Sequence, residues 1–159
     1  MIVLKNILVA TDFEPASDAA LTYGRALART FGARLHLLHV GENDFLRASV
    51  TDPQVLNAAV ARRLNERLTA EDRADRGARA TLQVSDQPAH AITRYAKHEH
   101  IDLIVMGTHG RTGVTHMLMG SVAEHVVRTA PCPVLTVRHP EHEFVLPDAA
   151  AAVSEMRAS

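Results

Sequence analysis

The sequence predicts an α/β protein in which an open parallel sheet of five strands carries helices on both faces. Apolar runs of strand length alternate along the chain with stretches whose apolar residues recur every three or four positions, as in amphipathic helices. The apolar runs are continuous, which is typical of strands that are buried on both sides of a sheet. With 159 residues and 47% apolar residues, the chain has the length of one domain and enough apolar side chains for a core.

The first part of the chain predicts two strands joined by a helix. The apolar run 2–10 predicts the first buried strand, and the run 35–40 predicts the second. Between them, apolar residues recur at helical spacing over 20–31. We expect Ser17 to cap the amino end of this helix, because a hydroxyl there accepts from a free backbone amide. Gly32 is placed to end the helix in the left-handed conformation.

A long helix is predicted after a polar loop at 41–52. Pro53 suits the first helical position, and Gly77 is placed to end the helix. The apolar side chains that would face the core recur every four residues: Leu56, Val60, Leu64 and Leu68. Charged residues between them would form the solvated side: Arg62, Arg63, Glu66 and Arg67.

The second half of the chain alternates in the same way and completes the sheet. Residues 78–84 predict the third strand, 89–98 a short helix, and 101–106 the fourth strand. A helix from about 120 to 129 and a last strand at 133–137 follow. Parallel sheets of this kind bind ligands beyond the carboxyl ends of their strands, so we expect a site in the loops after the first and fourth strands.

A glycine-rich segment follows the fourth strand and is the most informative feature of the chain. Residues 107–113 are G-T-H-G-R-T-G, and Gly120-Ser121 then opens the next helix. Glycines let a backbone approach an anion, and free amides at a helix start point toward it, so the pattern predicts a phosphate site. No Lys-Ser or Lys-Thr pair follows the last glycine, as a Walker A loop requires. The glycines also lie too far apart and too late in the chain for a dinucleotide fingerprint.

The spacing of Gly107, Gly110 and Gly120-Ser121 resembles the nucleotide motif of the universal stress protein family. Two further segments resemble that family in the right order, the opening strand with its terminal aspartate at 6–13 and the last strand at 130–137. The resemblance implies an adenine nucleotide alpha hydrolase-like, Rossmann-like sheet with strand order 3-2-1-4-5. The first and fourth strands would then be neighbours, and their loops would flank one crevice.

The resemblance further implies that the protein binds ATP, together with magnesium, in that crevice. The ribose would lie near Asp12, the adenine between Val40 and Met106, and the phosphates over the glycine-rich segment. The residues implied to bind the nucleotide are Ala10, Thr11, Asp12, Val40, Met106, Gly107, His109, Gly110, Arg111, Gly120, Ser121 and Val122.

Plainer roles stay open for several of these residues. Asp12 alternatively caps a local turn, and the apolar strand ends Val40 and Met106 alternatively belong to the core. Arg111 is either a phosphate contact or a solvent-exposed arginine. His109 is expected to be a turn residue that bonds locally or touches a phosphate.

The sequence favours recognition over chemistry, because no nucleophile with a dedicated general base is apparent. We expect a nucleotide-dependent stress or regulatory protein that acts on a regulatory protein partner, with no catalytic residue. Two alternatives stay open. One is a slow ATPase or phosphotransferase, for which only Asp12 and His109 could supply acid or base; the other is an interaction module without nucleotide.

Composition argues against other classes of function. A net charge of −1 gives no reason to expect a nucleic acid partner, and no segment approaches the roughly 20 apolar residues of a membrane span. The single cysteine, Cys132, fits a reducing compartment, so we expect a cytoplasmic protein. His36 and His39 would face opposite sides of a strand, and no spacing in the chain predicts a metal site.

The last strand, 133–137, would lie at an edge of the sheet. An exposed apolar edge invites pairing with another chain, and the resemblance implies a homodimer in which this strand pairs with its copy. Because the core pattern ends there, residues 1–138 are expected to form the universal stress protein domain and 139–159 a C-terminal extension. The alternative is that this extension covers the edge.

Overall fold

The computed structural model describes residues 1–41, 52–108 and 119–139. Of the residues implied to bind the nucleotide, His109, Gly110 and Arg111 lie outside these ranges. The C-terminal extension lies outside them as well, from residue 140 onward.

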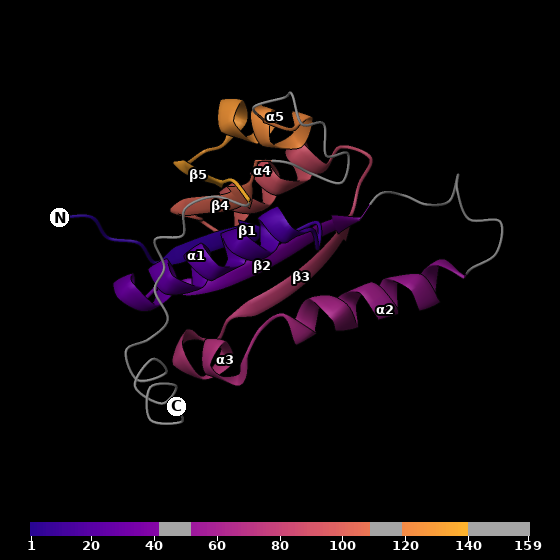
Figure 1. The fold of residues 1–159 in the computed structure, drawn as a ribbon, viewed down its shortest axis with the longest axis horizontal. Helices are drawn as coiled ribbons and strands as arrows, with labels where there is room; N and C mark the ends of the chain where they lie inside the picture. The colour runs from indigo at the N-terminus through magenta and orange to yellow at the C-terminus, as the bar shows by residue number, and fades with distance from the viewer. Residues whose placement is uncertain (42–51, 109–118, 140–159) are drawn as a thin grey trace, which may run out of the picture.

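Five parallel strands form one sheet in the order β3-β2-β1-β4-β5, which confirms the predicted topology (Figure 1). The strands are β1 (Asn6–Ala10), β2 (Arg34–Gly41), β3 (Arg79–Val84), β4 (Leu103–Gly107) and β5 (Val134–Val137). β1 pairs in parallel with both β2 and β4, so the strand order reverses at β1. The carboxyl ends of the first and fourth strands therefore lie side by side, as expected.

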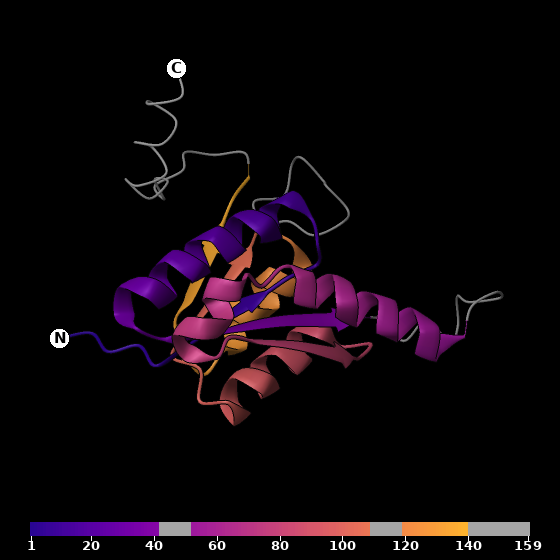
Figure 2. The same ribbon diagram turned by 90° about the horizontal axis from the view of Figure 1, so that it is seen from below.

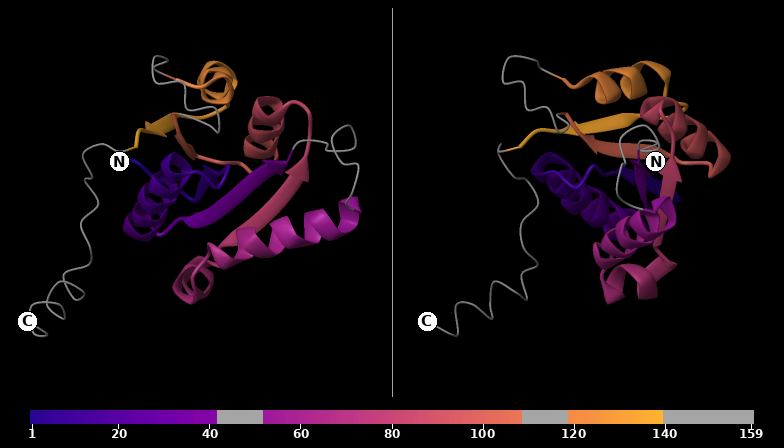
Figure 3. Two further views of the ribbon diagram at one scale, coloured as in Figure 1. Left: turned by 45° about the vertical axis from the view of Figure 1, so that its right-hand side comes forward. Right: turned by 90° about the vertical axis from the view of Figure 1, so that its right-hand side faces the viewer.

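Helices cover both faces of the sheet (Figures 1 and 3). The helices on one face are α1 (Pro15–Phe31), α2 (Pro53–Glu66) and α3 (Ala70–Arg76), seen from their own side in Figure 2. Those on the other face are α4 (Pro88–His98) and α5 (Ser121–Thr129). Within the described ranges, no helix is long and apolar enough to cross a bilayer.

The core consists of two apolar layers, one on each face of the sheet. Side chains alternate along β1, so that Ile7 and Val9 pack with α1 while Leu8 packs with α4 and α5. All three side chains are fully buried. This burial on both faces explains why the strands appear in the sequence as continuous apolar runs.

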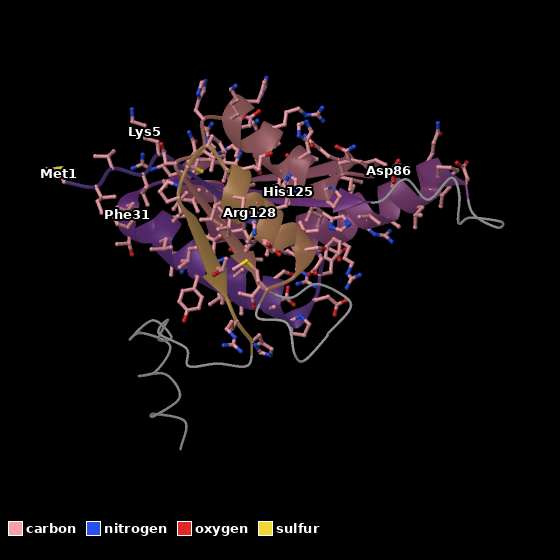
Figure 4. All side chains as sticks on the ribbon, turned by 90° about the horizontal axis from the view of Figure 1, so that it is seen from above. Met1, Lys5, Phe31, Asp86, His125 and Arg128 are labelled. Atoms are coloured by element: carbon pink, nitrogen blue, oxygen red, sulfur yellow. The ribbon has the colours of Figure 1, made fainter. Side chains whose placement is uncertain are left out.

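The amino ends and the carboxyl ends of the strands lie at opposite ends of the molecule. Lys5 and Phe31, which precede β1 and β2, lie at the end of the molecule opposite Asp86, which follows β3 (Figure 4). The amino ends of the strands therefore face one way and the carboxyl ends the other. His125 and Arg128 of α5 lie on the outer side of the α4–α5 layer in the same view.

The predicted start of the first strand is wrong. β1 begins at Asn6, not at residue 2, and Ile2 is 73% exposed. The Asp102 carboxylate accepts from the backbone amides of Lys5 and Asn6, at 2.7 and 2.9 Å. This contact fixes the chain where the strand starts, and the Lys5 carbonyl also accepts from the Arg34 amide of β2 at 2.7 Å.

The predicted cap of the first helix is wrong as well. α1 begins at Pro15, so Ser17 lies inside its first turn, where its hydroxyl donates to the Glu14 carbonyl at 2.9 Å. Proline at the first helical position sets the start of the helix, since its fixed φ suits that position and it has no amide to satisfy. At the other end, Gly32 adopts a φ of 63°, as expected of a helix-ending glycine.

The long helix predicted from Pro53 to Gly77 is two helices. It starts at Pro53 and stops at Gly77 as expected, but α2 ends at Glu66 and α3 begins at Ala70. Thr69 and Asp72 form a capping box, in which each side chain accepts from the other's backbone amide. The Arg25 guanidinium, from α1, holds the Asp72 carboxylate at 2.9 Å. The capping signal stands in the sequence, directly after Leu68, but the apolar spacing of four that leads up to it favoured one continuous helix.

Candidate functional site

A cavity of about 300 Å³ opens at the carboxyl ends of β1, β2 and β4, beside the amino ends of α4 and α5. Every implied nucleotide-binding residue within the described ranges lines it: Ala10, Thr11, Asp12, Val40, Met106, Gly107, Gly120, Ser121 and Val122. The predicted crevice and the observed cavity therefore coincide over the described part of the chain.

The segment after β1 is held by a chain of hydrogen bonds. The Phe13 amide donates to Thr11 Oγ1 at 3.0 Å, and Thr11 Oγ1 lies 3.0 Å from Ser17 Oγ. Because the Ser17 hydroxyl donates to the Glu14 carbonyl, the Thr11 hydroxyl must donate to Ser17. These hydrogen bonds link the turn at the end of β1 to the first turn of α1.

Asp12 has the local role that the sequence left open and also lines the cavity. Its Oδ1 accepts from the Glu14 amide at 3.0 Å. A carboxylate has about four acceptor sites, so this bond leaves the group able to accept from a ligand hydroxyl as well. The two roles considered for Asp12 are therefore compatible.

The carboxyl end of β4 is tightly packed. A Cβ on Gly107 would lie 2.9 Å from Ala16 Cβ and 3.0 Å from the Ala16 carbonyl carbon. A glycine is needed here because α1 crosses β4 at this point, a packing reason that sequence reasoning did not find. Beyond it, the Thr108 amide donates to the Val137 carbonyl, and the Thr108 carbonyl accepts from the Gly120 amide.

α5 points its amino end at the cavity. Gly120 is its N-cap residue and has no side chain with which to cap this end. Ser121 and Val122, which follow, line the cavity. Backbone amides and the partial positive charge at a helix start favour an anion in this position.

The lining of the cavity also has an apolar part. Val40 and Met106 line it, and Met106 is 5% exposed and also belongs to the α4–α5 core layer. The two roles considered for this residue, cavity wall and core, are again compatible. An apolar wall facing polar groups at strand and helix ends is the usual construction of a small-molecule site.

Sequence reasoning missed several lining residues: Ser17, Leu38, His39, Gly41, Pro88, Ile92, Thr108 and Ala123. Leu38, His39 and Gly41 flank Val40 at the end of β2, and Thr108 follows Gly107, so strand-end position could have indicated them. Pro88 and Ile92 belong to α4, and only the packing of that helix against the sheet brings them to the cavity.

The two histidines of β2 face opposite sides of the sheet, as predicted. His39 Nδ1 lies 2.7 Å from the Thr11 carbonyl oxygen beside the cavity. His36 Nδ1 lies 2.9 Å from the Tyr95 hydroxyl of α4, and burial lowers the pKa of His36 to about 4. Among the residues described, no group of His, Cys, Asp and Glu side chains could hold a metal ion.

Cys132 lies outside the cavity, before β5, and is partly buried. Burial, and then the nearby Asp102 carboxylate, raise the pKa of its thiol. A thiol with a raised pKa is protonated at neutral pH, so its surroundings do not favour a nucleophilic role.

Comparison with known proteins agrees with this architecture. The profile of the universal stress protein family matches residues 4–138. The chain belongs to this family. A universal stress protein of Thermus aquaticus is 38% identical over 140 residues, an alignment that covers 84% of this chain and 98% of the relative.

Solved structures of universal stress proteins share the fold. The protein MJ0577 of Methanocaldococcus jannaschii superposes with a TM-score of 0.71 and is 27% identical, covering 89% of this chain and all of that one. A universal stress protein of Archaeoglobus fulgidus was solved in complex with dAMP. It has a TM-score of 0.58 and is 21% identical, covering 86% of this chain and 99% of the other, so it shows the fold alone.

Proposed function

We propose that this universal stress protein binds ATP, with magnesium, in the cavity at the carboxyl ends of the strands. The observation that carries the proposal is the convergence of three groups on one cavity: the Asp12 turn, the apolar wall of Val40 and Met106, and the amino end of α5. The chain belongs to a family in which a protein of the same fold was solved with dAMP, and this membership makes an adenine nucleotide the candidate ligand.

Each part of the nucleotide has a matching surface in this proposal. Adenine lies between Val40 and Met106, two apolar side chains that line the cavity. A ribose hydroxyl donates to the Asp12 carboxylate. The phosphates lie at Gly107, Gly120, Ser121 and Val122, where α5 begins, together with His109, Gly110 and Arg111 of the glycine-rich segment.

We propose that the protein binds ATP without turning it over, and that this binding regulates a protein partner in the cytoplasm. Among the described lining residues, the titratable side chains are Asp12 and His39. Asp12 Oδ1 accepts from Glu14, and His39 Nδ1 contacts the Thr11 carbonyl, so each already has a structural task. This arrangement favours a stable complex with ATP over its turnover.

The assembly we propose is a homodimer that pairs through β5. This strand lies at one edge of the sheet, and Leu135 on it is 37% exposed. The match of the family profile to residues 4–138 supports a division into a domain at 1–138 and an extension at 139–159.

The proposed function predicts that substitution of Asp12 weakens ATP binding. Asp12→Asn removes the charge but keeps an amide of the same shape, so we expect affinity for ATP to fall about tenfold, as when a charge-assisted hydrogen bond is lost. Isothermal titration calorimetry with ATP and magnesium measures this change. Mass spectrometry of nucleotide released on denaturation shows which nucleotide the purified protein carries.

Glu66→Gln is the matched control, since Glu66 is exposed on α2 and lines no part of the cavity. It should bind ATP like the wild type. Absence of bound nucleotide, together with no uptake of added ATP, would contradict the proposal and favour an interaction module without nucleotide.

A further inference from the structure

We propose that His39 is a positioning residue for the nucleotide site. It holds the turn 11–13 in the conformation that presents the Asp12 carboxylate to the cavity, and Phe13 acts with it. The inference about ATP affinity rests on the proposed function, whereas the inference about the turn does not.

Phe13 has a backbone conformation that needs a compensating interaction. Its φ is 67°, in the left-handed region that bulky L-residues rarely adopt. Such a conformation persists where the surroundings enforce it, and it is common at ligand sites. Here it turns the chain directly after Asp12, so that the Asp12 carboxylate lines the cavity while the Phe13 side chain is 8% exposed in the core.

His39 holds this turn from the neighbouring strand. Its Nδ1 lies 2.7 Å from the Thr11 carbonyl oxygen. A carbonyl oxygen only accepts, so Nδ1 carries the proton and donates. Both groups are buried, with His39 and Thr11 each 7% exposed, so the bond is protected from competing water.

The same imidazole also supports the Phe13 ring. The two ring centroids lie 4.5 Å apart with planes inclined by 46°. The Arg63 guanidinium of α2 lies over the Phe13 ring at 4.4 Å from its centroid. His39 therefore contacts the residues on both sides of Asp12, through a hydrogen bond to Thr11 and through a ring contact with Phe13.

The proposed role of His39 predicts which contact with the nucleotide its substitution affects. If His39 acts through Asp12, its loss should affect the contact between Asp12 and the ribose and leave the contacts to base and phosphates in place. ATP and 2′,3′-dideoxy-ATP separate these contributions, because only ATP has ribose hydroxyls for a carboxylate to accept from.

Two substitutions of His39 separate the donor from the ring. His39→Phe keeps an aromatic ring and removes the donor, whereas His39→Asn keeps an amide donor near the position of Nδ1 and removes the ring. We expect His39→Phe to lower the affinity for ATP about tenfold while the affinity for 2′,3′-dideoxy-ATP stays within about twofold. His39→Asn should retain most of the preference for ATP. If His39→Phe does not fold, His39→Leu provides the variant without a donor.

Amide hydrogen exchange tests the turn without any nucleotide. The Phe13 and Glu14 amides donate to Thr11 Oγ1 and Asp12 Oδ1, so they report directly on the turn. We expect their exchange to be about tenfold faster in His39→Phe, with amides of β5 unchanged.

The two experiments keep the failure of each proposal distinct. Equal losses of affinity for ATP and 2′,3′-dideoxy-ATP, or unchanged exchange at Phe13 and Glu14, would overturn the role of His39. If the wild type binds neither nucleotide, the proposed function fails, and the exchange rates alone decide whether His39 holds the turn.

Discussion

At the residue scale, the two histidines of β2 show how position in a sheet sets the task of a side chain. Residues three apart on a strand face opposite sides. His39 reaches the end of β1 and lines the cavity, whereas His36 is buried against α4, where its Nδ1 contacts the Tyr95 hydroxyl. The same residue type therefore serves the site on one face and the core on the other.

The burial of His36 predicts a pH dependence of stability. Burial is the largest cause that lowers its pKa from the usual 6.5 to about 4, so the unfolded chain takes up a proton at a higher pH than the folded one. The free energy of unfolding should therefore fall as pH falls from about 6.5 toward 4, by roughly 3 kcal/mol at full effect. Above that window His36 is neutral in both states and contributes no slope.

Urea unfolding at a series of pH values measures this effect, with His36→Asn as the comparison. Asparagine does not titrate and can still bond to the Tyr95 hydroxyl, so the variant should be less dependent on pH even if it is less stable at pH 7. An identical slope in both proteins would assign the pH dependence to other groups.

At the element scale, the crossing of α1 over β4 limits what can occupy the end of β4. Gly107 meets Ala16 of α1, and a Cβ added there would lie closer than real Cβ atoms come to their neighbours. The same glycine lines the cavity. Helix packing therefore requires a glycine at a position that also lines the cavity.

This crossing predicts that Gly107→Ala destabilises the protein. The added methyl group meets backbone atoms of α1, which cannot move alone, so we expect a loss of about 1–3 kcal/mol in the free energy of unfolding. Gly41→Ala is a matched control, because Gly41 also lines the cavity but a Cβ there would have its nearest atom at 3.8 Å. Urea midpoints compare the two, and equal midpoints would mean that α1 adjusts without cost.

At the same scale, the structure corrects the prediction of one long helix where α2 and α3 lie. Apolar residues spaced by four run through Leu64 and Leu68, and both are buried as expected. The helix nevertheless breaks between them, because Thr69 and Asp72 cap a new helix and Arg25 anchors the Asp72 carboxylate. Arg67, expected on the solvated side, instead bonds to Asp18 of α1.

At the scale of the whole molecule, we propose different roles for the two edges of the sheet. β5 forms one edge and β3 the other. Leu135 on β5 and Val84 on β3 are both exposed, at 37% and 46%. Our proposal of a dimer through β5 distinguishes these edges, although each is the outermost strand of the described sheet on its side.

Leu135→Lys should convert the dimer to a monomer, since a charge at an apolar pairing edge must lose its water on association. Val84→Lys places the same charge on the opposite edge and should leave the dimer intact. Sedimentation velocity gives the molecular mass of each variant. A wild-type monomer, or dissociation by Val84→Lys alone, would contradict pairing through β5.

The order of the strands along the chain, and the end of the sheet where the cavity opens, could be predicted from the sequence without coordinates. Apolar periodicity depends on local geometry, and ligand cavities of parallel sheets form at the carboxyl ends of the strands. Only the folded molecule shows which residues of α4 reach the cavity, why Gly107 lacks a side chain, and that His39 contacts the Asp12 turn. The reason is that each of these depends on contact between segments far apart in the chain, which local patterns do not encode.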